Sequence, residues 1–209
     1  MDPQEVIAWL RRLVYLDLRV FEEVRSNPAA TIPGVIIVVV ATLIAGLGGW
    51  LWWLINDFPL AGDIFVHSAI IGSLIAVVLW ALVWLGIVYF MLTQVFRERA
   101  YVEQLLRVMG LAASPLALMG LIFIPGLSFG IGLTSLALTF GLTSVAIKAV
   151  TTADTARVLA ANALGFFVWA AALSLLASSS LSSVEPHAPG IFLYNATNSI
   201  AQEILQLSE

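Results

Sequence analysis

The stretch RVMGLAASPLALMGLIFIPG, from Arg107 to Gly126, is almost wholly apolar and yet carries Pro115 near its middle and Pro125 near its end. Its length and composition suit a helix that crosses a bilayer, which needs roughly 20 apolar residues. Proline removes a backbone donor and clashes with the preceding turn, at about 3 kcal/mol inside an ordinary helix. This stretch therefore combines the composition of a membrane span with the residue that most disfavours a regular one.

The composition of the whole chain is that of an integral membrane protein. Of the 209 residues, 61% are hydrophobic and 11% are charged, and the mean hydropathy is +1.01. A soluble globular protein carries roughly 25% charged residues. The chain has no cysteine, which excludes disulfides and thiolate metal sites. A net charge of -4, without a basic run longer than Arg11-Arg12, excludes a nucleic-acid partner.

Five stretches are long and apolar enough to cross about 30 Å of hydrocarbon as helices. They are Ile32–Ile55, Ile64–Thr93, Leu106–Ile124, Leu127–Ile147 and Ala156–Ala177, and none contains aspartate or glutamate. We therefore predict an all-α integral membrane protein with five transmembrane helices in a membrane domain of residues 28–177.

The basic residues predict the orientation of these spans. All nine lie before the first span, around the connection between the second and third, or around that between the fourth and fifth: Arg11, Arg12, Arg19, Arg25, Arg97, Arg99, Arg107, Lys148 and Arg157. Cytoplasmic segments carry an excess of Lys and Arg. We therefore predict a multi-pass protein of the plasma membrane with a cytoplasmic N-terminus and an extracytoplasmic C-terminus.

Residues 1–27 are predicted to form a cytoplasmic amphipathic helix over positions 3–25. Asp2 can cap this helix and Pro3 suits its first turn, while Asn27-Pro28 ends it. One stripe carries arginines, and the opposite stripe is apolar: Val6, Leu10, Leu13, Val20 and Val24. Such a helix could lie in the membrane interface or pack on the cytoplasmic ends of the bundle.

Residues 178–209 are predicted to be an extracytoplasmic tail. Apolar and small positions recur at helical spacing between Leu193 and Leu207. This pattern predicts a short amphipathic helix outside the membrane.

Small residues and one amide mark where helices are expected to meet. Small residues recur every four positions, which lets membrane helices pack closely: Ala41, Ala45 and Gly49 in the first span, Ser68, Gly72 and Ala76 in the second, and Gly126 and Gly130, beside Ser128 and Gly132, in the fourth. We expect packing within the chain, with a homodimer or partner face as the alternative. Asn162 is expected to bond a neighbouring helix, with a threonine of the fourth span as a candidate.

Other residues leave room for a bound cofactor. His67 at the start of the second span, with Trp80 and Trp84 deeper in it, could contact a chlorophyll-type pigment, a carotenoid or lipid. The alternative is that these residues belong to the membrane interface and the core. No metal site and no catalytic constellation is visible, so we expect no enzyme. A coupled transporter is disfavoured because no ionisable residue lies at mid-membrane.

A family resemblance rests on residues 101–127. Tyr101, Leu105-Leu106-Arg107, Gly110, Ala112-Ala113, Pro115 and Ile124-Pro125-Gly126-Leu127 resemble the Yip domain family of Ypt/Rab-GTPase-interacting membrane proteins, in the pattern of its bacterial-type members. The resemblance extends over about residues 15–177. It implies five spans and a cytoplasmic N-terminus. The Asp-Leu-Tyr-Gly-Pro signature of eukaryotic members is absent, so Rab binding is not carried over.

The resemblance also implies roles for particular residues. Pro115 would kink the third helix, with Ser114 and neighbouring helices satisfying the freed carbonyls. Pro125-Gly126 would form the tight turn into the fourth helix.

The function implied is a non-enzymatic membrane scaffold or adaptor that binds a membrane protein or a larger complex. The predicted docking residues are cytoplasmic and basic: Arg11, Arg12, Arg19, Arg97 and Arg99. The alternatives are an accessory structural subunit of a respiratory or photosynthetic complex and, less favoured, a small transporter.

Overall fold

A computed structural model describes residues 3–55, 65–124 and 126–180 of the chain. All regular structure within these ranges is helical. The helical elements are α1 (Pro3–Val14), α2 (Val20–Ser26), η1 (Pro28–Ala30), α3 (Thr31–Ile55), η2 (Phe65–Gly72), α5 (Ser73–Leu79), η3 (Trp80–Trp84), α6 (Leu85–Phe90), η4 (Met91–Val95), α7 (Val102–Ala112), η5 (Ser114–Leu121), α8 (Ser128–Val150) and α9 (Thr155–Ser180). The expected tail helix beyond position 180 and Pro125 lie outside the described residues.

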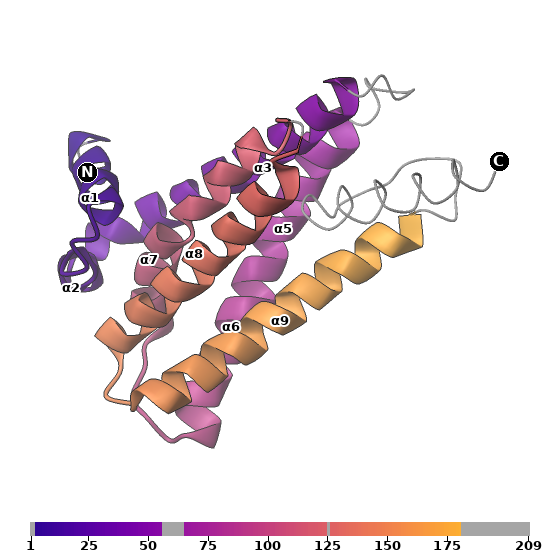
Figure 1. The fold of residues 1–209 in the computed structure, drawn as a ribbon. Helices are drawn as coiled ribbons and strands as arrows, with labels where there is room; N and C mark the ends of the chain where they lie inside the picture. Colours follow the sequence, from indigo (N-terminus) through magenta and orange to yellow (C-terminus); the bar gives the residue numbers. More distant parts are fainter. Residues whose placement is uncertain (1–2, 56–64, 125, 181–209) are drawn as a thin grey trace.

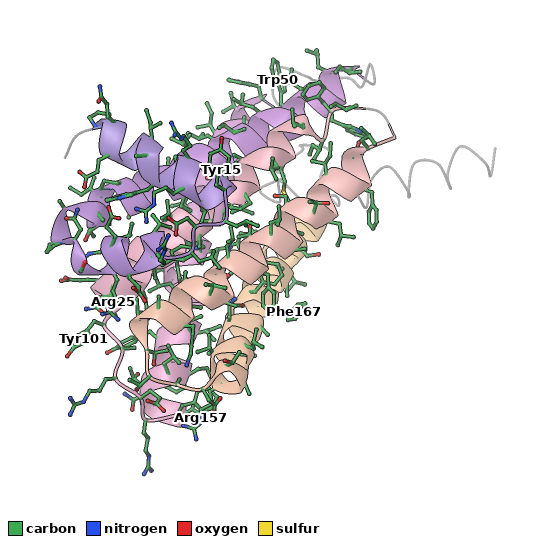
Figure 2. The ribbon with its side chains drawn as sticks, turned by 60° about the vertical axis from the view of Figure 1, so that its left-hand side comes forward. Tyr15, Arg25, Trp50, Tyr101, Arg157 and Phe167 are labelled. Carbon is green, nitrogen blue, oxygen red and sulfur yellow. The ribbon has the colours of Figure 1, made fainter. Side chains whose placement is uncertain are left out.

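Five helical segments are long and apolar enough to span a membrane, which confirms the predicted fold class. They are Pro28–Trp52, Ala69–Val95, Val102–Leu121, Ser128–Val150 and Thr155–Leu176. Figure 1 shows them running side by side in one bundle, with α1 and α2 beside it near one end. Many large apolar side chains on these spans point outward, including Leu82 at 72% exposure and Phe167 at 66%, and Figure 2 shows Phe167 at the edge of the bundle. This outer surface suits contact with lipid.

The N-terminal segment differs from the single helix predicted over positions 3–25. It forms two helices, because α1 ends in a turn in which Leu16 adopts a left-handed φ of 58°. The amide of Asp17 donates to the carbonyl of Arg12, and that of Leu16 donates to the carbonyl of Leu13. These two bonds form the helix-ending motif that usually places glycine at the left-handed position. Leucine in this conformation costs about 1–2 kcal/mol in backbone strain. The residues around Leu16 include no glycine, asparagine or proline that would predict a turn.

The apolar stripe of the N-terminal segment packs on the protein. Leu13, Val20 and Val24 are buried, together with Trp9 and Phe21, and Val6 and Leu10 are partly buried against the same core. α2 packs against α7 and α8. Of the two alternatives for this stripe, the structure therefore favours packing on the bundle over insertion into the membrane interface.

The second and third spans are irregular helices. In the second, the π-helical turns η2, η3 and η4 alternate with α5 and α6. In the third, α7 gives way at Ala113 to the 3-10 helix η5, and Pro115 lies in its first turn. Proline tolerates a first turn because its missing N–H has no helical acceptor there. The hydroxyl of Ser135, on α8, donates to the carbonyl of Pro115 at 2.8 Å. A neighbouring helix thus bonds the irregular segment.

Glycines allow the first and third spans to touch along their backbones. A Cβ added at Gly110 would lie 2.5 Å from the carbonyl oxygen of Gly34, and one at Gly48 would lie 2.3 Å from that of Met119. Ala41 and Ala45 of the predicted small-residue pattern are buried in the core. The expected close packing within the chain is therefore confirmed for the first span.

The same expectation is wrong for the fourth span. A Cβ added at Gly126, Gly130 or Gly132 would meet nothing within 4 Å. Gly126 instead serves a turn, since its φ is 76° and the amide of Leu127 donates to the carbonyl of Ile124 at 3.2 Å. Glycine adopts this conformation without a Cβ penalty. In the second span Gly72 and Ala76 are buried, while the side chain of Ser68 is not among those described.

Candidate interaction surface at the basic end

The helices place the described basic residues of the bundle at one end. α3, α7 and α9 begin there, and η4 and α8 end there; we call it the basic end. Figure 2 shows Arg25, Tyr101 and Arg157 at this end and Trp50 at the other. Arg25 donates to the carbonyl of Ala149 at 2.7 Å, which fixes the end of α2 to the end of α8.

Arg107 joins three elements at the basic end. Its side chain is 8% exposed, and it donates to the hydroxyl of Thr31 at 2.8 Å, to the carbonyl of Arg25 at 3.1 Å and to the carboxylate of Glu103 at 3.2 Å. The planar guanidinium offers several donors in fixed directions, which suits three acceptors on separate elements. A buried charge must be paired and hydrogen-bonded to be tolerated. Arg107 therefore holds α2, α3 and α7 together.

Glu98 links the segment between η4 and α7 to the segment between α8 and α9. Its carboxylate accepts from the hydroxyl of Thr152 at 2.8 Å and from the guanidinium of Arg157 at 3.1 Å. Lys148 donates to the carbonyl of Ala153 in the second of these segments. Glu98 and Arg157 are thus used to order the surface between the spans.

An ion-pair network fixes the hairpin of α1 and α2. The indole of Trp9 donates to Glu23 at 2.7 Å, and Arg12 donates to both Glu23 and Asp17. Arg19 donates to Asp17 at 3.1 Å. Hydrogen bonds from Trp9 and Arg12 hold the pKa of Glu23 below its usual value, and those from Arg19 and Arg12 do so for Asp17. Hydrogen bonds to Glu23 and Asp17 raise the pKa of Arg12.

The five predicted docking arginines therefore fall into two groups. Arg12 and Arg19 form ion pairs within the hairpin. Arg11, Arg97 and Arg99 are exposed, and none of the three forms an ion pair with another described residue. The sequence could not separate these groups, because the acidic partners approach only once Leu16 turns the chain back. Asp17 and Glu23 were missed as structural acids for the same reason.

Arg97, Arg99 and Tyr101 form an exposed loop at this end. Arg97 has a left-handed φ of 56°, which is uncommon for a non-glycine residue. Glu98 turns inward to Thr152 and Arg157, while the flanking arginines remain exposed and Tyr101 is 63% exposed. The loop thus exposes two guanidinium groups and a phenol.

A second polar site lies inside the bundle around Asn162. Its amide donates to Thr143 at 2.9 Å, to Ser144 at 2.8 Å and to the carbonyl of Phe140 at 3.1 Å. Its carbonyl oxygen accepts from the indole of Trp84 at 2.8 Å. The structure thus brings Asn162 to a threonine of the fourth span, in a site whose polar groups bond one another.

The candidate cofactor residues are only partly brought together. Trp84 and Trp169 pack with ring centroids 5.2 Å apart, and Trp84 donates to Asn162. Trp80 is buried, and its indole nitrogen has no hydrogen-bond partner among the described residues. The side chain of His67 is not among those described. No cluster of His, Cys, Asp and Glu suited to a metal ion occurs in the described part of the chain.

The fold and this surface define a class: a multi-pass membrane protein built from five apolar helices, with its described charges ordered at one end. A family model described as the Yip1 domain matches residues 17–183. This match covers most of the chain, and the protein belongs to the Yip family. No curated protein and no solved structure matches the chain.

Proposed function

We propose that this protein is a non-enzymatic adaptor that binds a membrane protein partner through the basic end. The observation that carries the proposal is the exposed loop of Arg97, Arg99 and Tyr101, in which the intervening Glu98 is turned inward to Arg157. Arginine and tyrosine are enriched among the residues that contribute most to protein interfaces. The family assignment supports a role of this general kind.

The division among the arginines sharpens the proposed docking face. A guanidinium that already pairs with a carboxylate would have to give up or share that pair to bind an acidic partner, so it gains little from docking. Arg11, Arg97 and Arg99 have no such partner among the described residues, so a partner with acidic groups gains three new ion pairs. Arg12 and Arg19 are assigned to holding the hairpin.

We further propose that the protein lies in the plasma membrane with the basic end facing the cytoplasm. The support is the positive-inside bias, because every described basic side chain lies outside the spans or at this end of them. Residues 1–27 would then be the cytoplasmic segment, residues 28–177 the membrane domain and residues 178–209 the tail on the opposite side.

The test is co-purification from a mild detergent. Tagged wild-type protein should bring a stoichiometric partner, which the double variant Arg97→Glu/Arg99→Glu should lose. Arg97→Lys/Arg99→Lys is the matched control, because it changes the same two positions but keeps both positive charges, and it should retain the partner. A homogeneous monomer in several detergents, or equal loss in the double variant and the control, would overturn the proposal.

One observation favours the alternative of a complex subunit that contacts a pigment or lipid. The buried indole N–H of Trp80 lacks an acceptor among the described residues, and an unpaired buried donor costs about 1–3 kcal/mol. A bound carbonyl or ester oxygen would satisfy it. Pigment absorption bands in the purified protein, lost in His67→Ala or Trp80→Phe, would support this alternative over a plain adaptor. A colourless protein would exclude a bound pigment, so that a subunit of this kind could only contact lipid or have a structural role.

A further inference from the structure

The turn between α1 and α2 has the opposite polarity to an ordinary surface turn. Val14 is 80% exposed, Tyr15 76% and Leu16 68%, whereas the side chain of Asp17 is only 28% exposed. Soluble surfaces rarely expose a contiguous apolar patch unless it binds something. We call Val14, Tyr15, Leu16 and Leu18 the apolar tip.

The hairpin network holds the apolar tip outward. Asp17 accepts from Arg12 at 3.0 Å and from Arg19 at 3.1 Å, so its carboxylate occupies the inner side of the turn. Glu23 ties Arg12 and Trp9 to α2. These ion pairs hold Asp17 within the hairpin, while the apolar side chains of the tip point outward.

The hairpin is fixed at the level at which the spans reach the basic end. Arg25, one residue before the end of α2, donates to Ala149 at the end of α8, and its carbonyl accepts from Arg107 in α7. Ile7, which is 63% exposed, lies two helical turns before Val14 and so on the same face of α1. Figure 2 shows Tyr15 on this hairpin, on the side of the bundle turned toward the viewer.

We propose that the apolar tip inserts into the boundary between headgroups and acyl chains of the bilayer. Tyrosine is enriched at this depth, and arginines beside it can extend their charge to the headgroups. Arg11 lies between Ile7 and Val14 on the same face of α1, and Arg19 is 86% exposed just after the tip. The tip and the outward-pointing apolar side chains of the spans would then contact the same bilayer.

The apolar tip, and not the apolar stripe, is thereby the proposed membrane contact of the N-terminal segment. The stripe is buried on the protein, so lipid contact is assigned to the turn. The proposal is independent of the docking loop around Arg99, since it needs no protein partner.

Spin labels test it in the full-length protein, because the chain has no cysteine. Val14→Cys and Tyr15→Cys would be labelled and reconstituted in vesicles of phosphatidylcholine and phosphatidylglycerol. Glu22→Cys on α2 is the aqueous reference, and Phe167→Cys on α9 is the lipid reference. We expect labels at the tip to relax with dissolved oxygen several-fold more than with a water-soluble nickel chelate, as at 167, and the label at 22 to show the reverse.

Leu16→Asn separates insertion from folding of the hairpin. Asparagine adopts the left-handed conformation more readily than leucine, so the turn should persist. In this background the label at Val14 should shift toward the nickel chelate, while a label at Glu22 should not change. Tip labels that favour the nickel chelate in the wild-type background would overturn the proposal. So would tip labels shielded from both reagents or broadened by a second copy, since these indicate a protein on the tip.

Discussion

The backbones of Gly34 and Gly110 are in direct contact, because a Cβ added at Gly110 would lie 2.5 Å from the carbonyl oxygen of Gly34. Gly34 is near the start of α3 and Gly110 near the end of α7, so the contact joins the first and third spans close to Arg107. Helices in a membrane associate through such close packing, since lipid supplies no hydrophobic force between them. This crossing is therefore a main support of the basic end.

Gly110→Ala should destabilise the protein by about 1–3 kcal/mol, as overpacking of a tight contact does. Gly141→Ala is the matched control, because a Cβ there meets nothing within 4 Å. It should be neutral or stabilising by up to about 1 kcal/mol, since alanine favours a helix over glycine. Thermal unfolding in detergent, followed by circular dichroism, gives both midpoints. A midpoint for Gly110→Ala at or above that of the wild type would contradict the crossing.

Asn162→Leu should cost about 1–2 kcal/mol, mainly by leaving the indole of Trp84 without its acceptor. The loss of the Asn162 amide costs less at Thr143 and Ser144, because their hydroxyls also donate to the carbonyls of Thr139 and Phe140. Trp84→Phe in the Asn162→Leu background should therefore cost less than it does in the wild type. A double-mutant cycle on unfolding free energies measures this coupling. Additive costs would show that the 2.8 Å bond contributes nothing.

Arg107→Lys should destabilise the basic end by about 1–3 kcal/mol, although it keeps the charge. An ammonium group cannot reproduce the directed bonds of the guanidinium to Thr31, Arg25 and Glu103. Arg99→Lys is the control at an exposed arginine and should leave the unfolding midpoint unchanged. Equal midpoints for the two variants would indicate that the contacts of Arg107 are dispensable.

The pairing of α1 with α2 should weaken in acid. The pKa values of Asp17 and Glu23 are lowered in the folded hairpin, so their contribution is complete above the unfolded values of about 4. It is lost as the pH falls through the lower folded values. The distance between spin labels at Ala8 and Glu22 should be narrowly distributed near neutral pH and broad in acid well below about pH 4.

A matched variant shows whether these carboxylates cause the change. Asp17→Asn/Glu23→Gln removes both titrations, so its distance distribution should already be broad at neutral pH and should change little in acid. A wild-type hairpin that stays narrow throughout would contradict the role given to the network.

The sequence predicts the spans well because lipid forces every backbone group to bond within the chain, so apolar length alone identifies a helix. The prediction fails at Leu16, since leucine carries no turn signal and the end of α1 depends on acidic residues beyond the turn. It also cannot tell which glycines meet a neighbour. Gly48 and Gly130 look alike along the chain, and only the crossing of the spans distinguishes them. The two groups of docking arginines differ for the same reason.

Single cysteines can show whether five spans place the basic end in the cytoplasm. Ser26, Asp63, Arg99, Asp154 and Ser183 would each be replaced by cysteine in the cysteine-free chain and treated on intact cells with an impermeant maleimide. We expect labelling only at positions 63 and 183. Labelling at 26 or 99 would contradict the orientation, and equal labelling at 99 and 183 would contradict the number of spans.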